Sequence, residues 1–362
     1  MSGRRQGPAR WPDFAAPPLA VVAALGCGAL LVAILGRNPF EVYAVLVRET
    51  FGSWYGFGQV LFKATTLAGT GLAVAVAFRA GLFNIGAEGQ MYLGGLAGAA
   101  AALALPAALP APLAALAVLA AAAAAGGAWG AVPGILRARL GVHEVINTIM
   151  MNFIAFALGS WILVRWLAQF ETLHTAEIPA VARLARLEQA LPVLRGAPVN
   201  TSLFVCIAAC VASALLLWRT RWGFEVRALG LSENAARTAG IPVRRRLVEA
   251  LALSGALAGI AASNFVQGYK YYFEEGFTAD AGFRGIAVAL LARNHPLAVL
   301  PAALLFGALD RGGFVLGRLV PKEFVDILQA LVLLFVIVLG PWLRRSVARR
   351  AIAAEGVPQW TS

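Results

Sequence analysis

Long apolar runs separated by short polar segments dominate the chain. A membrane-spanning helix needs about 20 mostly apolar residues to cross a hydrocarbon core of about 30 Å. Such runs occur at residues 18–36, 58–78, 112–136, 143–168, 200–218, 248–266, 296–317 and 325–342. Two further stretches, 84–105 and 279–293, are apolar but interrupted by glycine and polar residues. Counting both, the pattern predicts an all-α, polytopic helical bundle with about ten transmembrane helices.

Clusters of arginine alternate with balanced segments and predict how the spans are oriented. If residues 1–17 form a cytoplasmic tail and the sides alternate, the arginine-rich segment 219–247 also lies inside. The segments that fall outside are balanced or slightly acidic, and they are residues 37–56, 169–199 and 267–282. By the positive-inside rule, both termini are expected in the cytoplasm. One transmembrane domain would then cover 18–342, followed by a cytoplasmic tail at 343–362.

Composition supports a membrane protein and argues against a nucleic-acid-binding one. The chain has 362 residues, of which 60% are hydrophobic and 13% charged, whereas soluble proteins average about 25% charged residues. The net charge is +12, but only three basic residues are lysines: Lys63, Lys270 and Lys322. The arginines sit in short clusters between apolar runs and do not suggest a continuous basic groove. Lipid is therefore the expected partner, with no nucleic acid.

Signatures of catalysis and of metal binding are missing from the sequence. It contains no GxxxxGK[ST], GxSxG or HExxH motif, so neither a nucleotide-binding P-loop nor a recognisable catalytic centre is expected. The three cysteines, Cys27, Cys206 and Cys210, lie in apolar runs without CxxC spacing, which argues against a metal site. The chain itself is not expected to be an enzyme, or to need a cofactor or metal.

The first interrupted stretch places polar groups within a predicted span. Asn84, Glu88 and Gln90 fall in the segment RAGLFNIGAEGQ at 79–90. Polar groups at membrane depth usually face a cavity or the bundle interior, and broken helices are common where a substrate passes. These residues are candidates for a substrate pathway or its gate. The alternative is that they only cap the cytoplasmic end of the span.

A polar stripe follows in the segment GVHEVINTIMMN. Glu144, Thr148 and Asn152 are four residues apart and share one helix face, with Asn147 beside them. Because lipid offers such groups no partner, the stripe should face inward. It is a second candidate part of the pathway. Alternatively, these side chains only form hydrogen bonds to neighbouring helices, each worth roughly 1 kcal/mol or less.

The arginine-rich inside segment contains a short helix signal. Ser232 is a suitable N-cap, and Gly240 would end the helix. A capped helix between two spans could dock a cytoplasmic partner, or it could be a solvated loop that only enforces topology. The residues assigned to this docking element are Ser232, Glu233, Asn234, Ala235, Ala236 and Gly240.

The segment EEGFTADAGFRGI at 274–286 opens the second interrupted stretch and adds Phe283 to the candidate pathway residues. The two interrupted stretches are the third and eighth spans in the predicted order. They are five positions apart in that order, so two equivalent five-span halves would be inverted relative to each other. Inverted repeats of this kind are typical of transporters.

Three segments resemble those of the membrane permease subunits of bacterial ABC importers for simple sugars and nucleosides, the ribose-type family. GLFNIGAEGQ matches the family signature, and GVHEVINTIMMN is similar to the longer permease of nucleoside systems. NAARTAGI resembles the family's coupling motif, with Ala235, Ala236 and Gly240 at its fixed positions. Asn234 stands where classical importers often carry glutamate.

The resemblance implies an inner-membrane permease that forms the translocation pathway for a nucleoside or simple sugar. Its segment 219–247 would couple to a separate cytoplasmic ABC ATPase. A second permease subunit, identical or different, and a periplasmic or lipid-anchored substrate-binding protein would complete the system. The alternative is an ion-coupled secondary transporter of a small polar solute, which would normally place acidic residues deep in its spans.

Overall fold

The computed structural model describes residues 11–106, 108–317, 319–321 and 323–354. Helices dominate this part of the chain, and no β-strand is found in it beyond isolated bridges. The ends of the two predicted cytoplasmic tails, residues 1–10 and 355–362, lie outside the described residues.

The chain divides into two compact units, one of residues 1–48 with 312–362 and one of residues 49–311. The first contains α1 (Trp11–Ile34) and α14 (Glu323–Ala354), which pack against each other. The boundaries fall within α2 (Pro39–Phe51) and α13 (Val299–Leu316). Helix α2 was not predicted, and it lies in a segment that the charge pattern had placed outside the membrane.

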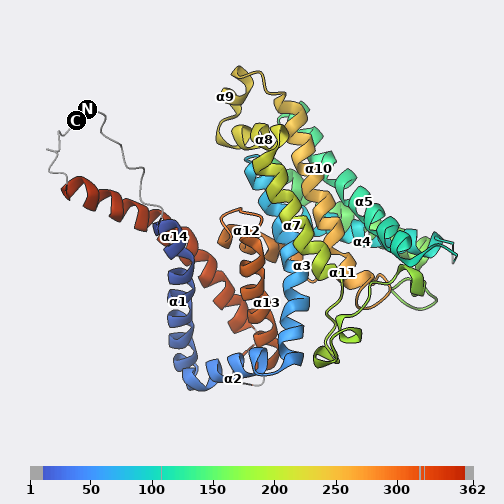
Figure 1. Cartoon of the computed structure of the whole chain (residues 1–362), viewed down its shortest axis with the longest axis horizontal. Helices are drawn as coiled ribbons and strands as arrows, with labels where there is room; N and C mark the ends of the chain where they lie inside the picture. Colours follow the sequence, from blue (N-terminus) through green and yellow to red (C-terminus); the bar gives the residue numbers. More distant parts are fainter. Residues whose placement is uncertain (1–10, 107, 318, 322, 355–362) are drawn as a thin grey trace. The chain divides into compact units, whose positions relative to one another are not determined.

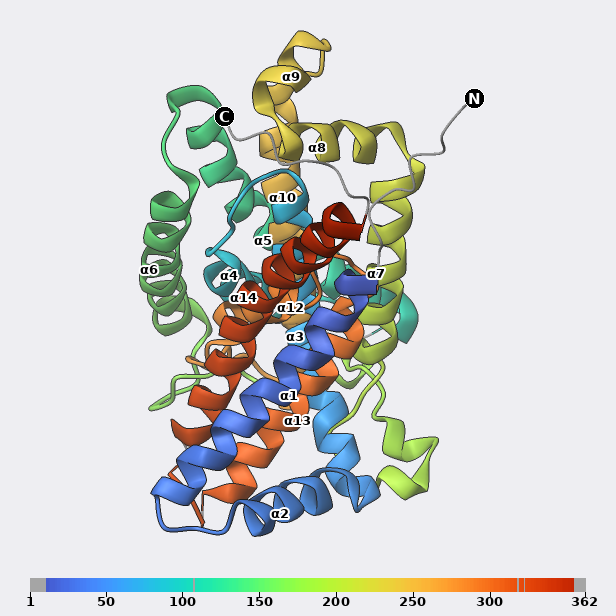
Figure 2. The ribbon, with the colours of Figure 1, turned by 90° about the vertical axis from the view of Figure 1, so that its left-hand side faces the viewer.

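The second unit contains the remaining elements. Its α-helices are α3 (Trp54–Arg79), α4 (Ala87–Ala104), α5 (Ala111–Leu140), α6 (Glu144–Ile162), α7 (Ser202–Arg219), α8 (Arg221–Leu231), α9 (Glu233–Thr238), α10 (Val243–Ala261), α11 (Ser263–Val266) and α12 (Ala281–Leu291). Single turns are a π turn at Leu163–Leu167 and 3-10 turns at Ala180–Ala182, Leu187–Gln189 and Pro192–Leu194. Figures 1 and 2 show α3 and α10 running through the middle of this unit.

Among the described residues, six helical segments are long and apolar enough to cross a membrane. They are Trp54–Arg79, Ala111–Leu140, Glu144–Leu167, Ser202–Arg219, Val243–Val266 and Val299–Leu316. The polytopic all-α fold is therefore confirmed, while the count of ten spans and the inverted halves stay predictions. Both interrupted stretches are broken as expected: α4 begins only at Ala87, and the apolar helix α12 is only 11 residues long.

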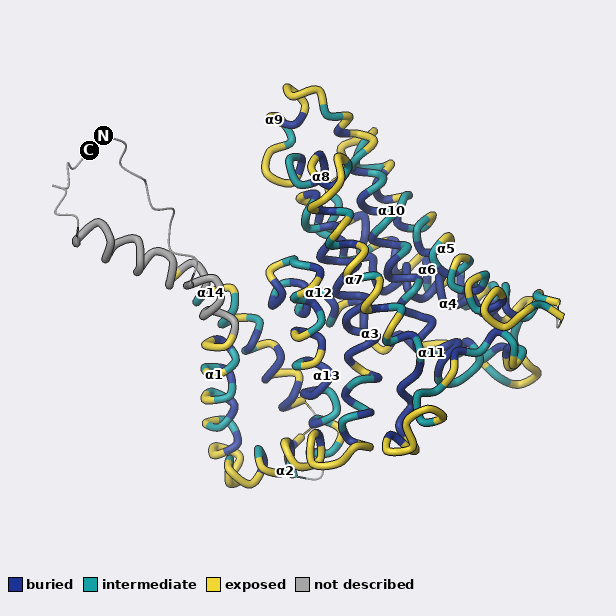
Figure 3. The backbone as a smooth tube through the Cα atoms, in the orientation of Figure 1, coloured by how far each residue is buried: buried dark blue, intermediate teal, exposed yellow. Residues whose placement is uncertain are grey.

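Burial separates central helices from outer ones (Figure 3). Most of α3 and α10 is buried, whereas α5, α6 and α7 expose long rows of apolar side chains. Leu116, Phe153 and Leu215 are examples, each more than half exposed. Apolar faces of this extent are not tolerated in water, so the structure fits a chain that is dissolved in lipid.

Glycines let α5 and α10 pack at very short range. A Cβ on Gly255 would lie 2.2 Å from the carbonyl oxygen of Gly126, and one on Gly130 would lie 2.4 Å from the oxygen of Leu251. Small residues four apart allow such backbone contact in membranes. Gly126 and Gly130 are four residues apart in the sequence, as are Gly255 and Gly259. Gly98 differs, since a Cβ there would make only ordinary contacts at 3.5 Å.

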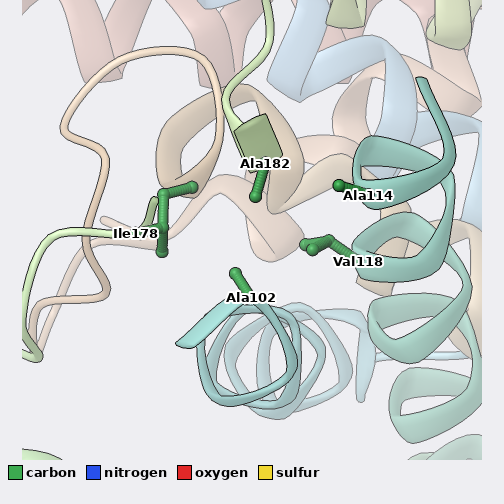
Figure 4. Close-up of a cluster of buried hydrophobic side chains, with 5 residues drawn as sticks. All are labelled: Ala102, Ala114, Val118, Ile178 and Ala182. Carbon is green, nitrogen blue, oxygen red and sulfur yellow. The ribbon is translucent and has the colours of Figure 1, made fainter. Parts of the chain in front are cut away.

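The segment 168–200 is an ordered connection without an α-helix. Residues 184–194 form only the two 3-10 turns Leu187–Gln189 and Pro192–Leu194. Pro192 lacks an N–H for a continued helix, and Gly196 reverses the chain at φ +81°. A small apolar cluster joins this segment to the ends of α4 and α5 (Figure 4), and it consists of Ala102, Ala114, Val118, Ile178 and Ala182.

Candidate functional site

The turn between α3 and α4 is fixed by buried amide side chains. Asn84 donates from Nδ2 to Oε1 of Gln90 and to Oγ of Ser254, both at 2.8 Å. Its Oδ1 accepts from the backbone N–H of Gly86 at 2.9 Å. Ser254 in turn donates to the carbonyl of Ala73 at 2.6 Å. All of these side chains are buried, so the network joins α3, α4 and α10 through the site where the helix is broken.

The polar stripe of α6 supports the same turn from the other side. Thr148 Oγ1 accepts from the N–H of Ile85 at 3.2 Å. Asn152 donates to the carbonyl of Ile85 at 3.0 Å and accepts from the N–H of Gly89 at 2.9 Å. Asn147 donates to the carbonyl of Pro133 in α5 at 3.2 Å. Thr148 and Asn152 thus replace backbone partners that the broken helix has lost, which is what non-helical backbone at membrane depth requires.

Glu144 does not join this buried network. Its carboxylate lies 3.4 Å from Nε of Arg137 at the end of α5. The same arginine lies 3.6 Å from Glu233 in α9. Glu144 therefore faces the end of the bundle where α9 lies, although it shares a helix face with Thr148 and Asn152.

Glu88 binds the start of α12. Its carboxylate accepts hydrogen bonds from the backbone N–H groups of Asp280, at 3.1 Å, and of Gly282. The residue is only 2% exposed. A carboxylate at a helix N-terminus is favoured by the helix dipole. A Cβ on Gly282 would lie 2.4 Å from the backbone nitrogen of Glu88, so only glycine permits this approach.

A cavity of about 440 Å³ lies beside α12 and α3. This volume is in the range of small-molecule sites. Its polar lining comes from Gln59, Lys63, Thr66, Thr278, Arg284 and Asp310. Arg284 donates to Asp310 at 2.8 Å, so these two charges largely neutralise each other.

Aromatic rings form another part of the cavity wall. Phe62 and Tyr269 pack with ring centroids 5.1 Å apart, and Phe265 lies 5.2 Å from Phe277. The cavity thus combines flat apolar surface with hydrogen-bonding groups, and its charged groups are the Arg284–Asp310 pair and Lys63. Such a lining suits a neutral polar solute that also has a flat or apolar face.

The cavity lining differs from the residues chosen from the sequence. Among the described residues that line it, none belongs to the candidate pathway set. Phe283 in α12 is 39% exposed, but the following residue, Arg284, reaches the cavity. Signals for the missed residues were present, since Lys63 and Thr66 are polar positions in the apolar run 58–78.

No group of three or more His, Cys, Asp or Glu residues in the described part of the chain could hold a metal ion.

The segment 219–247 forms two helices that lie beyond the ends of α7 and α10 (Figure 2). Helix α9 is the predicted capped helix: Ser232 accepts from the N–H of Ala235 at 3.3 Å, and Gly240 follows the helix at φ +76°. Helix α8 was missed. It begins after Thr220, whose hydroxyl accepts from the N–H of Gly223 at 3.1 Å.

An ion-pair cluster attaches α8 to the start of α10. Glu225 accepts from Arg246 at 2.7 Å and from Arg221 at 3.1 Å. The hydrogen bond from Arg246 is the main reason why the pKa of Glu225 lies below its usual value. Trp222 donates to Glu249 at 2.8 Å, and Glu249 also pairs with Arg246.

Comparison with known proteins identifies the kind of membrane protein. Residues 56–337 match the family described as the permease component of the branched-chain amino acid transport system. The chain belongs to this permease family.

Three relatives cover most of the chain. The guanosine ABC transporter permease protein of Bacillus subtilis is 38% identical over 325 residues, which are 88% of this chain and 92% of the relative. The glucose ABC transporter permease protein of Haloferax volcanii is 37% identical over 348 residues, covering 93% and 90%. The nucleoside ABC transporter permease protein NupB of Lactococcus lactis is 35% identical over 329 residues, covering 89% and 90%.

These similarities confirm the family that the sequence motifs resembled. The chain is a multi-pass membrane permease of the ABC transporter type. The ion-coupled secondary transporter, which the sequence had left as an alternative, is not supported.

Proposed function

We propose that this permease imports a nucleoside or a simple sugar, driven by ATP. The cavity beside α12 carries the proposal, because its size, aromatic wall and neutralised ion pair suit such a solute. Three relatives are named as permeases for guanosine, nucleosides or glucose, which are solutes of the proposed classes. Base–aromatic stacking is worth about 1–3 kcal/mol per base. The rings of Phe265 and Phe277 in the cavity wall therefore favour a nucleoside over a sugar.

The buried polar residues would have a supporting role in this pathway. Asn84, Gln90, Thr148 and Asn152 hold the α3–α4 turn, while the cavity residues would contact the solute. Phe283 and Asn147 stay candidates for the pathway wall in another conformation. Glu88 would position α12, which contributes Arg284 to the cavity.

ATP hydrolysis would take place in a separate ABC ATPase. Helices α8 and α9 are the proposed docking element, because they lie beyond the ends of the spans and expose Ser232, Asn234 and Ala235. A second permease subunit and a periplasmic or lipid-anchored substrate-binding protein would complete the transporter.

The proposed location is the inner membrane, with both termini and the segment 219–247 in the cytoplasm. The excess of arginine in that segment supports this orientation under the positive-inside rule. The membrane domain would cover 18–342, with tails at 1–17 and 343–362.

Reconstitution with the partner subunits tests the function. Proteoliposomes that contain the ATPase, the second permease and the binding protein should take up radiolabelled guanosine only when ATP is present. Uptake should persist when a protonophore removes the ion gradient. Uptake that survives ATP depletion and collapses with the gradient would overturn the proposal. Excess unlabelled guanosine should inhibit this uptake, and excess glucose should not. This difference would show that the solute is a nucleoside and not a sugar.

A further inference from the structure

Helix α12 is flanked at both ends by unusual backbone. Ala279 and Asp280, just before the helix, have φ values of +45° and +63°. Arg293 and Asn294, just after it, have φ values of +52° and +57°. Non-glycine residues in the left-handed region persist where surrounding contacts hold them. The ends of α12 therefore depend on contacts from outside the helix.

One short segment, residues 79–88, makes side-chain contacts at both ends of the helix. At the N-terminal end of α12, Glu88 accepts from the N–H groups of Asp280 and Gly282. At the C-terminal end, Arg79 donates from Nε to the carbonyl of Asn294 at 2.7 Å and from Nη2 to that of Arg293 at 3.2 Å. An acid at the N-terminus and a base at the C-terminus both complement the helix dipole.

Between its ends, α12 is packed tightly on α3. A Cβ on Gly285 would lie 2.6 Å from Oγ1 of Thr70, and one on Gly71 would lie 2.8 Å from Val288. Thr70 also donates to the carbonyl of Ala281 at 2.9 Å. Tightly packed elements of this kind move together or shift between discrete arrangements. Because α12 carries Arg284, any such movement changes the cavity wall.

The proposed docking element touches the same 79–88 segment. A Cβ on Gly230 of α8 would lie 2.3 Å from the carbonyl oxygen of Arg79, so the two backbones are in direct contact. Arg79 and Arg227 of α8 also lie over the ring of Trp218, at 5.1 and 5.8 Å from its centroid. A displacement of α8 therefore acts directly on the residue that holds the end of α12.

We propose that Arg79 and Glu88 form a two-ended clamp on α12, which passes movement of α8 to the wall of the cavity. The inference rests on the proposed function, since it assumes that an ATPase moves α8. Arg79 and Glu88 act as positioning residues: they hold the helix that contributes Arg284, and they do not line the cavity themselves.

The ratio of ATP hydrolysed to solute transported tests the clamp in the fully reconstituted transporter. Arg79→Gln and Glu88→Gln should each raise this ratio at least about tenfold, as expected from losing a hydrogen bond to a charged group. Arg79→Lys, which keeps the charge but only one donor nitrogen, should fall between them and the native protein. Arg139→Gln is the matched control, because it removes an exposed arginine from the end of α5 without touching α12.

A distance measurement reads the movement directly. Spin labels at Leu231→Cys in α8 and Ala287→Cys in α12, with Cys27, Cys206 and Cys210 replaced, should keep nearly the same separation when ATP is trapped, because the clamp makes the two helices move together. In Arg79→Gln, the separation should change when ATP is trapped, because α8 then moves without α12.

The outcomes separate this inference from the proposed function. A native protein that shows no ATP-driven uptake overturns both. A native protein that transports, with unchanged ratios and distances in the variants, overturns the clamp alone. Failure of all variants to assemble, Arg79→Lys included, would also overturn it, because the two residues would then serve folding only.

Discussion

The side chain of Asn84 compensates for the helix break at which it lies. It forms hydrogen bonds with Gln90, Ser254 and the backbone of Gly86, all buried. Buried polar groups of this kind are costly when one partner is lost. Asn84 therefore has a structural role at the helix break.

Replacing Asn84 should therefore reduce stability. In Asn84→Leu, the N–H of Gly86 and the amide of Gln90 lose partners inside the protein. We expect a loss of about 1–3 kcal/mol for each orphaned group, seen as a lower thermal unfolding temperature in detergent. Asn234→Leu, at an exposed position of α9, should unfold near the native temperature. Equal unfolding temperatures for both variants would contradict the structural role.

The sequence identified polar residues better than it identified their partners. The four-residue spacing of Thr148 and Asn152 correctly indicated a face turned toward other protein groups. The partner of Glu88 lies 192 residues away in the chain, and no local pattern reports such a contact. Phe283 and Arg284 differ by one position, which is about 100° around a helix. Choosing between them required the packing of α12.

At the scale of helices, the pairing of α5 with α10 depends on space at particular glycines. Gly255→Ala would place a methyl group 2.2 Å from the oxygen of Gly126. We expect it to force the helices apart and to lower stability by about 1–3 kcal/mol.

Gly98→Ala is the matched control for this substitution. Gly98 is also a buried glycine within a helix, but a methyl group there meets its neighbours at 3.5 Å. The two variants should therefore differ clearly in the fraction that remains monodisperse after heating in detergent. If Gly255→Ala tolerates heating as well as Gly98→Ala, the close packing of α5 and α10 is wrong.

The attachment of α8 should depend on pH through Glu225. Arg246 holds the pKa of this carboxyl below its usual value, so its stabilisation is present above the pKa of an unfolded glutamate, about 4.3. That stabilisation is lost as the pH falls through the lower, folded value. When the pH is lowered from 6, the free energy of unfolding of the native protein should therefore decrease by an amount that is missing in Glu225→Gln. The variant should already be less stable at pH 6, and a pH profile identical to that of the native protein would contradict the pairing.

Elements with strong apolar periodicity were predicted well, and short polar ones were not. Helix α9 was recognised because Ser232 and Gly240 mark its ends. Helix α8 was missed because its sequence, RWGFEVRALGL, mixes charges with apolar residues and its stability comes from contacts with α10. Residues 184–194 form turns, because Pro192 cannot continue a helix and Leu187 packs against a cluster that includes Ala197.

At the scale of the whole chain, charge and hydropathy predicted an oriented membrane protein before any contact was known. Six long apolar helices among the described residues confirm the class. The broken helices could be located from the sequence, because glycine and polar residues interrupt the apolar runs there. The cavity could not, because it is formed by residues from Gln59 to Asp310 that only the folded chain brings together.

The orientation itself can be tested with two matched positions. Phe170 is 90% exposed in the segment 168–200, and Leu231 is 89% exposed at the end of α8. In a background that lacks Cys27, Cys206 and Cys210, Phe170→Cys should react with a membrane-impermeant maleimide in intact spheroplasts. Leu231→Cys should react only after the membrane is permeabilised or inverted. Because the two sites are almost equally accessible in the folded protein, a difference between them reports the side of the membrane. The opposite labelling pattern would place α8 outside, where it could not meet a cytoplasmic ATPase.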